Sequence, residues 1–182
     1  LDLFKAFEYV TPQRLWRNGL ATGMPAPLLA WIISLYTGPR YPMYKDSIQE
    51  QPLWPRRGAP AGSRFADLAL RIVLLEPLDR FVALWPNSNL SVYIDDLTIQ
   101  GFGRRGHVKT NLLWTLKALS KAIASADLKI AADKGYVVAS DPLSAREIAS
   151  AARKIEGIPP IKALRSIRHL GADFGSGAAQ GR

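Results

Sequence analysis

Residues 90–100 read LSVYIDDLTIQ and place two adjacent aspartates, Asp95 and Asp96, between two runs of apolar and β-branched residues. Such runs are typical of strands, so we expect a hairpin with the aspartates at its tip. Tight hairpin turns favour Asn-Gly or Asp-Gly, whose backbones accept a positive φ. Two carboxylates without a glycine suit a plain turn poorly, and their charges repel unless a cation lies between them. The pair is therefore a candidate metal site, with an ordinary turn as the alternative.

A further carboxylate, Asp2, lies in an apolar stretch that reads as the end of a buried strand. Paired divalent cations about 4 Å apart can activate a hydroxyl and stabilise the leaving oxygen of an in-line displacement. That chemistry needs carboxylates from separate strands at one point, and two neighbouring strands could bring Asp2 and Asp95 together. The chain has no cysteine and two histidines, so oxygen ligands and hence Mg²⁺ or Mn²⁺ are expected.

The overall composition is that of a globular protein with a basic surplus. The chain has 182 residues, of which 48% are hydrophobic and 21% are charged, and its net charge is +9. This charge favours a polyanionic partner such as nucleic acid, and a basic protein without such a partner is the alternative. The apolar run at residues 25–36 is too short to span a bilayer, so no membrane association is expected. The chain starts at Leu1 beside an acidic motif, so we expect it to be part of a longer polypeptide.

Periodicity and capping signals predict a chain of alternating helices and short strands. Thr11 and Pro12 form a typical helix start, and Pro77 is a candidate kink. The expected helices cover residues 11–21, 26–36, 63–84, 108–126 and 145–156. Strands or hairpins are expected within residues 38–60, 90–100, 128–130, 136–138 and 167–174. We therefore predict an α+β fold, an antiparallel sheet covered on one face by two long helices.

Five segments, in order, resemble motifs of the reverse transcriptase palm, and the likeness is closest to retrotransposons without long terminal repeats. The segment DLFKAFE at residues 2–8 resembles the first palm motif, and YIDD at residues 93–96 matches the Tyr-x-Asp-Asp signature. The other three are GAPAGS at residues 58–63, LKIAADK at residues 128–134 and HLG at residues 169–171. The resemblance implies a palm over residues 1–174, and the glycine-rich composition of residues 175–182 predicts a mobile tail.

The resemblance also implies an activity, RNA-directed DNA polymerisation by two-metal nucleotidyl transfer from a dNTP to a primer 3′-hydroxyl on an RNA template. Asp2 and Asp95 would hold two Mg²⁺ or Mn²⁺ ions, with Asp96 in the same site and the carbonyl of Leu3 as an extra ligand. An intracellular location, in the nucleus or cytoplasm, is implied as well.

Further residues receive roles from the same resemblance. Phe7 would exclude a 2′-hydroxyl and so select deoxynucleotides, and the alternative is a core aromatic. Lys134 would lie near the triphosphate and could protonate pyrophosphate, and the alternative is a solvated lysine. The remaining implied sites are the nucleotide-binding loop at Ala61, Gly62 and Ser63 and the primer grip at His169, Leu170 and Gly171.

Departures from the family pattern keep two alternatives open. The usual glutamine of the glycine-rich loop is Ala61, and the usual asparagine before Lys134 is Ala131. The fingers and thumb of the family would lie outside this chain, so we expect it to polymerise weakly or not at all by itself. The alternatives are a catalytically inactive, nucleic-acid-binding remnant and an RNA-dependent RNA polymerase, against which Phe7 argues. Basic candidates for phosphate contacts are Arg56, Arg57, Arg104, Arg105, Lys117, Lys121, Lys162, Arg165 and Arg168.

Overall fold

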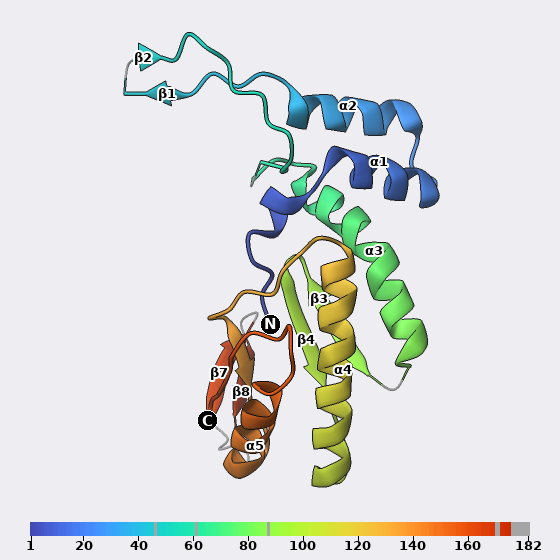
Figure 1. Ribbon diagram of the computed structural model, residues 1–182, viewed down its shortest axis with the longest axis vertical. Coiled ribbons are helices and arrows are strands. Elements are labelled where there is room, and N and C mark those ends of the chain that lie inside the picture. The colour runs from blue at the N-terminus through green and yellow to red at the C-terminus, as the bar shows by residue number, and fades with distance from the viewer. Residues whose placement is uncertain (46, 61, 87, 170–171, 176–182) are drawn as a thin grey trace. The chain divides into compact units, whose positions relative to one another are not determined.

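The structure is a computed structural model that describes residues 1–45, 47–60, 62–86, 88–169 and 172–175 (Figure 1). Its elements are helices and short strands, so the fold class is α+β. The chain divides into two compact units, one formed by Lys5–Pro77 and the other by Leu1–Phe4 together with Leu78–Arg182. The division falls inside one helix, α3 (Ala66–Leu84).

The Lys5–Pro77 unit contains a short 3-10 helix, η1 (Ala6–Tyr9), a pair of helices and the start of α3. Helix α1 (Pro12–Ala21) begins as predicted, because the Thr11 hydroxyl accepts a hydrogen bond from the Arg14 N–H at 3.4 Å. Helix α2 (Ala26–Thr37) lies beside α1 (Figure 1). The two helices approach closely because Gly19 has no side chain: a Cβ there would lie 2.5 Å from Cδ2 of the fully buried Leu29.

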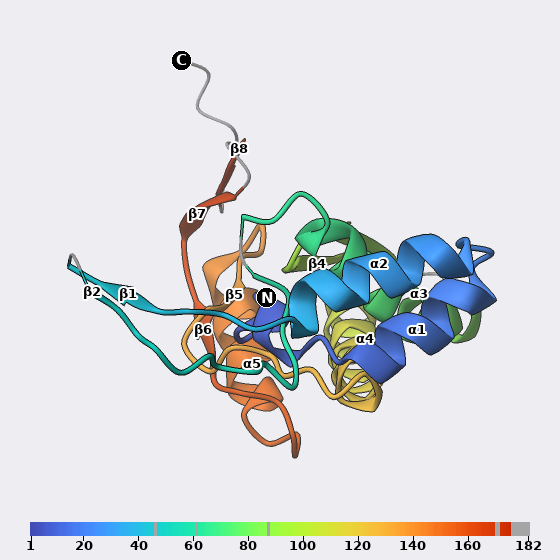
Figure 2. The same ribbon diagram turned by 90° about the horizontal axis from the view of Figure 1, so that it is seen from above.

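The same unit also carries a thin hairpin formed by β1 (Met43–Tyr44) and β2 (Ser47–Ile48). The strands are antiparallel, with Met43 opposite Ile48 and Tyr44 opposite Ser47. Closer to the helices, Arg40 and Leu53 exchange two backbone hydrogen bonds of 2.9 and 2.8 Å. Figure 2 shows this hairpin extending away from α2.

The other unit is built on a regular hairpin and two helices. Strands β3 (Asn89–Tyr93) and β4 (Asp96–Gln100) are antiparallel, and α4 (Arg105–Ser125) packs on β4 (Figure 1). Helix α5 (Pro142–Ala152) contacts α4 and the two strands β5 and β6. The remaining strands are β5 (Gly135–Val137), β6 (Ile161–Ala163), β7 (Ser166–His169) and β8 (Ala172–Gly175).

A compact apolar core holds α4, α5 and β6 together. Its buried members are Leu116, Ala152, Ile158 and Ile161. Half-buried side chains pack against this core from the chain start and from β4, among them Leu1 and Ile99. The core thereby anchors the two segments that carry the predicted catalytic aspartates.

The sheet arrangement differs from the single antiparallel sheet that the sequence predicts. Among the described residues the strands form four two-stranded sheets, and one of them, β5–β6, is parallel. The expected neighbours of the β3–β4 hairpin are present but pair only through isolated bridges, which are too short to count as strands. Helix α4 lies on β4 as predicted, whereas the covering role of the second long helix stays a prediction.

Candidate active site

The tip of the β3–β4 hairpin is a two-residue loop, Ile94-Asp95, closed by the pair Tyr93 and Asp96. Ile94 has a φ of 56°, in the left-handed region. A β-branched residue is rare there, because its Cβ approaches the following carbonyl at a cost of about 1–2 kcal/mol. The sequence therefore tolerates strain at the point where it presents two carboxylates, and such strain clusters at functional sites.

The start of the chain runs antiparallel to β4 and brings Asp2 to this tip. Leu1 and Leu97 exchange two hydrogen bonds of 2.8 and 2.7 Å, and the Leu3 N–H donates to the Asp95 carbonyl at 3.0 Å. Asp2 is consequently the bridge partner of Asp96 in a non-hydrogen-bonded pair. In such pairs the Cα atoms are about 4.5 Å apart and the two side chains point to the same face. Two carboxylates remote in sequence therefore lie next to each other.

A second backbone segment holds Leu1–Phe4 from its other edge. The Phe4 N–H donates to the Lys129 carbonyl and the Ala131 N–H donates to the Asp2 carbonyl, both at 2.8 Å. Leu3 is buried between the two edges. Asp2 is therefore fixed by backbone hydrogen bonds on both sides, which sets the position of its carboxylate relative to the hairpin.

Lys134 reaches the site from the same segment. Its Nζ lies 2.7 Å from Oδ2 of Asp2, with side-chain exposures of 57% for Lys134 and 17% for Asp2. The hydrogen bond and the charge of Asp2 raise the pKa of Lys134, so this group stays protonated at neutral pH. The sequence places Lys134 near the site only through the family resemblance, and its pairing with Asp2 has no sequence signal of its own.

Burial and neighbouring charges shift the pKa of Asp95. Burial raises the pKa of Asp95, and the negative charges of Asp2 and Asp96 raise it further. A backbone hydrogen bond and the charge of Lys134 act in the opposite direction. The three carboxylates thus lie within one electrostatic field, in which a bound cation would relieve repulsion.

The oxygen ligands at this site are of the type that a hard cation prefers, but the described side chains do not form a complete group of metal ligands. Carboxylate oxygens are ligands that Mg²⁺ and Mn²⁺ prefer, and no described residue donates a hydrogen bond to the Leu3 carbonyl oxygen. In the described part of the chain, however, no three His, Cys, Asp or Glu side chains are grouped as metal ligands. The Lys134 ammonium is the cation that now neutralises Asp2, so a metal ion would have to displace it.

Of the predicted nucleotide-binding residues, Lys134 belongs to the unit that holds the aspartates, whereas Phe7, Gly62 and Ser63 belong to the Lys5–Pro77 unit. Phe7 lies half-buried in η1, and its carbonyl accepts a hydrogen bond from the Ala59 N–H at 2.8 Å. Gly58 lies beside the backbone of Glu8, where a Cβ would make an ordinary contact at 3.4 Å, and its φ of 96° favours glycine. The first motif and the glycine-rich loop are therefore bonded to each other, although 50 residues separate them.

The rest of that loop leads into α3. Gly62 has a positive φ of 83°, and the Ser63 hydroxyl lies 3.2 Å from the Tyr36 hydroxyl. The Ser63 carbonyl accepts a hydrogen bond from the N–H of Ala66, where α3 begins. Ser63 thus precedes the helix by three residues, close to its predicted role of opening it. Ala61 lies outside the described residues.

The predicted primer grip is described only in part. His169 ends β7 and pairs in register with Ala172 of β8. Leu170 and Gly171, together with residues 176–182 of the predicted tail, lie outside the described residues.

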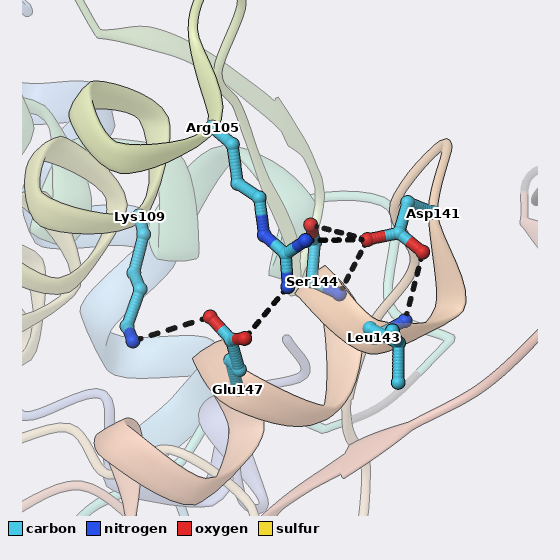
Figure 3. Close-up of polar contacts among 6 residues, drawn as sticks. All are labelled: Arg105, Lys109, Asp141, Leu143, Ser144 and Glu147. Atoms are coloured by element: carbon cyan, nitrogen blue, oxygen red, sulfur yellow. Dashed lines mark hydrogen bonds and ion pairs between the residues drawn. The ribbon is translucent and has the colours of Figure 1, made fainter.

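A second polar cluster, between α4 and α5, was not predicted from the sequence (Figure 3). Arg105 pairs with Asp141 at 3.3 Å and with Glu147 at 2.6 Å, and Lys109 pairs with Glu147 at 3.4 Å. Asp141 also caps α5, accepting hydrogen bonds from the N–H groups of Leu143 and Ser144. Arg105 is therefore engaged by two carboxylates rather than free for phosphate. The Asp141-Pro142 sequence repeats the Thr11-Pro12 signal and could have located this helix start.

Comparisons with known proteins leave the motif resemblance as it stands. No protein-family model, curated protein or solved structure matches this chain. Within the described residues, no helix has the length and apolar character needed to cross a membrane.

Proposed function

We propose that this chain carries the catalytic carboxylates of an RNA-directed DNA polymerase palm, within a longer retrotransposon-like polypeptide. The observation that carries the proposal is the pairing of Asp2 with Asp96 at the tip of a strained hairpin. A plain turn gives no reason for a third carboxylate to be held beside this tip by backbone hydrogen bonds on two edges. The order of the five palm-like segments supplies the reaction class.

In this proposal Asp2, Asp95 and Asp96 provide oxygen ligands for two Mg²⁺ or Mn²⁺ ions, with the Leu3 carbonyl as a further ligand. Bound ions would promote ionisation of the primer 3′-hydroxyl and offset the charge that develops on pyrophosphate. Lys134 holds Asp2 at 2.7 Å before a cation binds. Once released from Asp2, Lys134 is the proposed proton donor to the departing pyrophosphate, because a lysine side chain is protonated at neutral pH without any shift of its pKa.

Substrate choice is assigned to Phe7 and the loop it contacts. The Phe7 carbonyl accepts a hydrogen bond from the Ala59 N–H, so the backbone that carries Phe7 is joined to the glycine-rich loop. An aromatic side chain at the sugar would exclude a 2′-hydroxyl, which favours dNTPs over the ribonucleotides of an RNA-dependent RNA polymerase. Replacement Phe7→Ala should raise ribonucleotide use.

A second candidate is a catalytically inactive, nucleic-acid-binding remnant of such an enzyme. It is favoured by the ion pair that occupies Asp2 and by the absence of a three-carboxylate ligand group among the described residues. The alanine at position 61, in place of the usual glutamine, points the same way. This candidate keeps the net charge of +9 and the nucleic-acid partner but has no metal-dependent activity.

The test is single-nucleotide addition to a DNA primer on a heteropolymeric RNA template in Mn²⁺. The sensitive one-step readout suits the weak activity that we expect. Addition should be lost in Asp95→Asn and retained in Asp67→Asn, an exposed aspartate of α3. Addition by Asp95→Asn that equals addition by the wild type would reject the catalytic role of Asp95 and favour the inactive remnant.

A further inference from the structure

The hairpin that contains β1 and β2 is an exposed arm. We define the arm as residues 39–54, of which residue 46 lies outside the described residues. Every described residue from 39 to 51 is exposed. The two sides of the arm are joined by the β1–β2 ladder, by the bridge of Arg40 with Leu53 and by a hydrogen bond of 2.9 Å from the Gln49 N–H to the Pro42 carbonyl. A lone two-stranded hairpin is marginally stable in water, so this arm lacks the support of a core.

The arm nevertheless displays large side chains that proteins rarely leave in water. The exposed fractions are 75% for Tyr44, 63% for Trp54 and 55% for Tyr41. Met43, Ile48 and Leu53 are exposed as well. An extended apolar surface of this kind marks a binding site.

The two faces of the arm differ in chemistry. Met43 and Ile48 are directly opposite each other, and Tyr44 is opposite Ser47. Successive side chains of a strand point to opposite faces. One face at the tip is therefore aliphatic, and the other is aromatic and polar.

Basic groups accompany the aromatic residues. The Lys45 ammonium lies 5.5 Å from the centre of the Tyr44 ring, and Arg40, Arg56 and Arg57 are exposed at the base of the arm. The arm itself has two basic and two acidic residues, and the wider stretch 38–57, which includes Arg56 and Arg57, has four basic and two acidic residues. The arm and the residues directly after it therefore carry exposed aromatic rings and exposed basic side chains.

We infer that the exposed rings of the arm, Tyr44 near its tip and Trp54 at its base, bind single-stranded nucleic acid. Exposed rings offer stacking surfaces to unpaired bases, and the interleaved lysine and arginines offer cations to the phosphates. Duplex nucleic acid fits less well, since its bases are already stacked on one another. A protein partner would use the aliphatic face, Met43 and Ile48, which carries no charge. The inference concerns where the strand is held and does not depend on chemistry at Asp2, Asp95 and Asp96.

The experiment is a fluorescence-anisotropy titration of a labelled 20-nucleotide oligo(dT) or oligo(U) with the full chain in EDTA. The double variant Tyr44→Ala with Trp54→Ala should raise Kd at least about tenfold, as expected for the loss of stacked bases. Lys45→Ala should weaken binding and reduce its salt dependence. The unlabelled duplex of the same length should compete poorly.

Two control variants distinguish nucleic-acid binding by the arm from general electrostatic attraction of nucleic acid to the basic chain. Trp114→Ala removes a tryptophan that is 55% exposed on α4 and also lies beside a lysine, Lys117, at 5.6 Å. This variant, and Met43→Ala with Ile48→Ala, should bind within about twofold of the wild type, and circular dichroism melts should show all variants folded.

Three results would overturn the inference: unchanged binding in the Tyr44–Trp54 variant, an equal loss in Trp114→Ala, or a loss confined to the Met43–Ile48 variant. The last result would instead indicate a site for an apolar partner. Because EDTA removes divalent cations, failure here and failure of the polymerase proposal are separate outcomes.

Discussion

Ile94 adopts a left-handed backbone conformation that glycine accepts more readily than other residues. Its φ of 56° places a β-branched side chain in the left-handed region, directly before Asp95. The surrounding ladder enforces this conformation, because Tyr93 and Asp96 are paired and the Asp95 carbonyl is bonded to the Leu3 N–H. The strained conformation of Ile94 is therefore part of the turn that presents the carboxylates of Asp95 and Asp96.

The strain at Ile94 can be measured by comparing two substitutions at this one position. Glycine in a strand is normally less stable than alanine by about 0.5–1 kcal/mol. At Ile94 the order should be reversed by about 1 kcal/mol, because glycine accepts a positive φ and alanine does not. Urea unfolding of Ile94→Gly and Ile94→Ala measures the difference, and a more stable alanine variant would show that the turn is unstrained.

Asp95 contributes unfavourably to folding when it is charged. Its pKa is raised above the usual 3.8, first by burial and then by Asp2 and Asp96. The folded state therefore binds the proton more tightly than the unfolded state. Stability consequently falls as pH rises from the unfolded pKa through the folded one, and the penalty persists at neutral pH.

The raised pKa of Asp95 therefore predicts that removing its charge stabilises the protein, although Asp95 is a proposed catalytic residue. Asp95→Asn should raise Tm at pH 7, because it removes the partly buried charge and keeps an oxygen that can accept the backbone hydrogen bond. The gain should shrink as pH falls toward 4, where the wild-type carboxyl takes up its proton. Thermal melts of both proteins from pH 4 to 8 test this. A gain that is the same at all pH values would assign the effect to packing instead of charge.

At the level of elements, local signals located most of the helices. The Thr11-Pro12 start predicted α1, and the apolar runs predicted α2 and α4 to within three residues at either end. Helix α5 begins at Pro142, three residues before its predicted start, because the Asp141 cap was not recognised. What periodicity could not supply is which segments pair. The bridges of Leu3 with Ile130 and of Asp2 with Asp96 join distant segments and leave no local pattern.

The close contact of α1 and α2 gives a test at this scale. Alanine normally stabilises a helix relative to glycine by up to about 1 kcal/mol. Gly19→Ala should instead destabilise by about 1–3 kcal/mol, since its Cβ would meet three carbons of the fully buried Leu29 within 3.2 Å. Gly106 in α4 is the matched control, because a Cβ there meets nothing within 4 Å, and Gly106→Ala should be neutral or stabilising. Equal effects of the two changes in denaturant unfolding would exclude tight α1–α2 packing.

For the molecule as a whole, the sequence predicted the grouping of the aspartates at the candidate site better than it predicted the arrangement of the sheets. The two-aspartate hairpin and the need for a third carboxylate followed from the chemistry of Asp95 and Asp96, and the structure places Asp2 beside them. The roles of Phe7, Lys134 and the primer-grip residues came only from the resemblance. The pairing of Lys134 with Asp2 was missed, because a salt bridge between residues 132 positions apart depends on the complete fold. The arm was expected only as strands and turns, since exposure of its rings is a property of the folded chain.

The central claim, that Asp2, Asp95 and Asp96 form one divalent-cation site, is tested most directly by Mn²⁺ titration followed by electron paramagnetic resonance. The wild type should bind Mn²⁺, Asp2→Asn and Asp96→Asn should each lose most of this affinity, and Asp67→Asn should bind like the wild type. Lys134→Met should bind Mn²⁺ more tightly, because no ammonium competes for Asp2. Affinities that are equal in the wild type, Asp2→Asn and Asp96→Asn would contradict the claim.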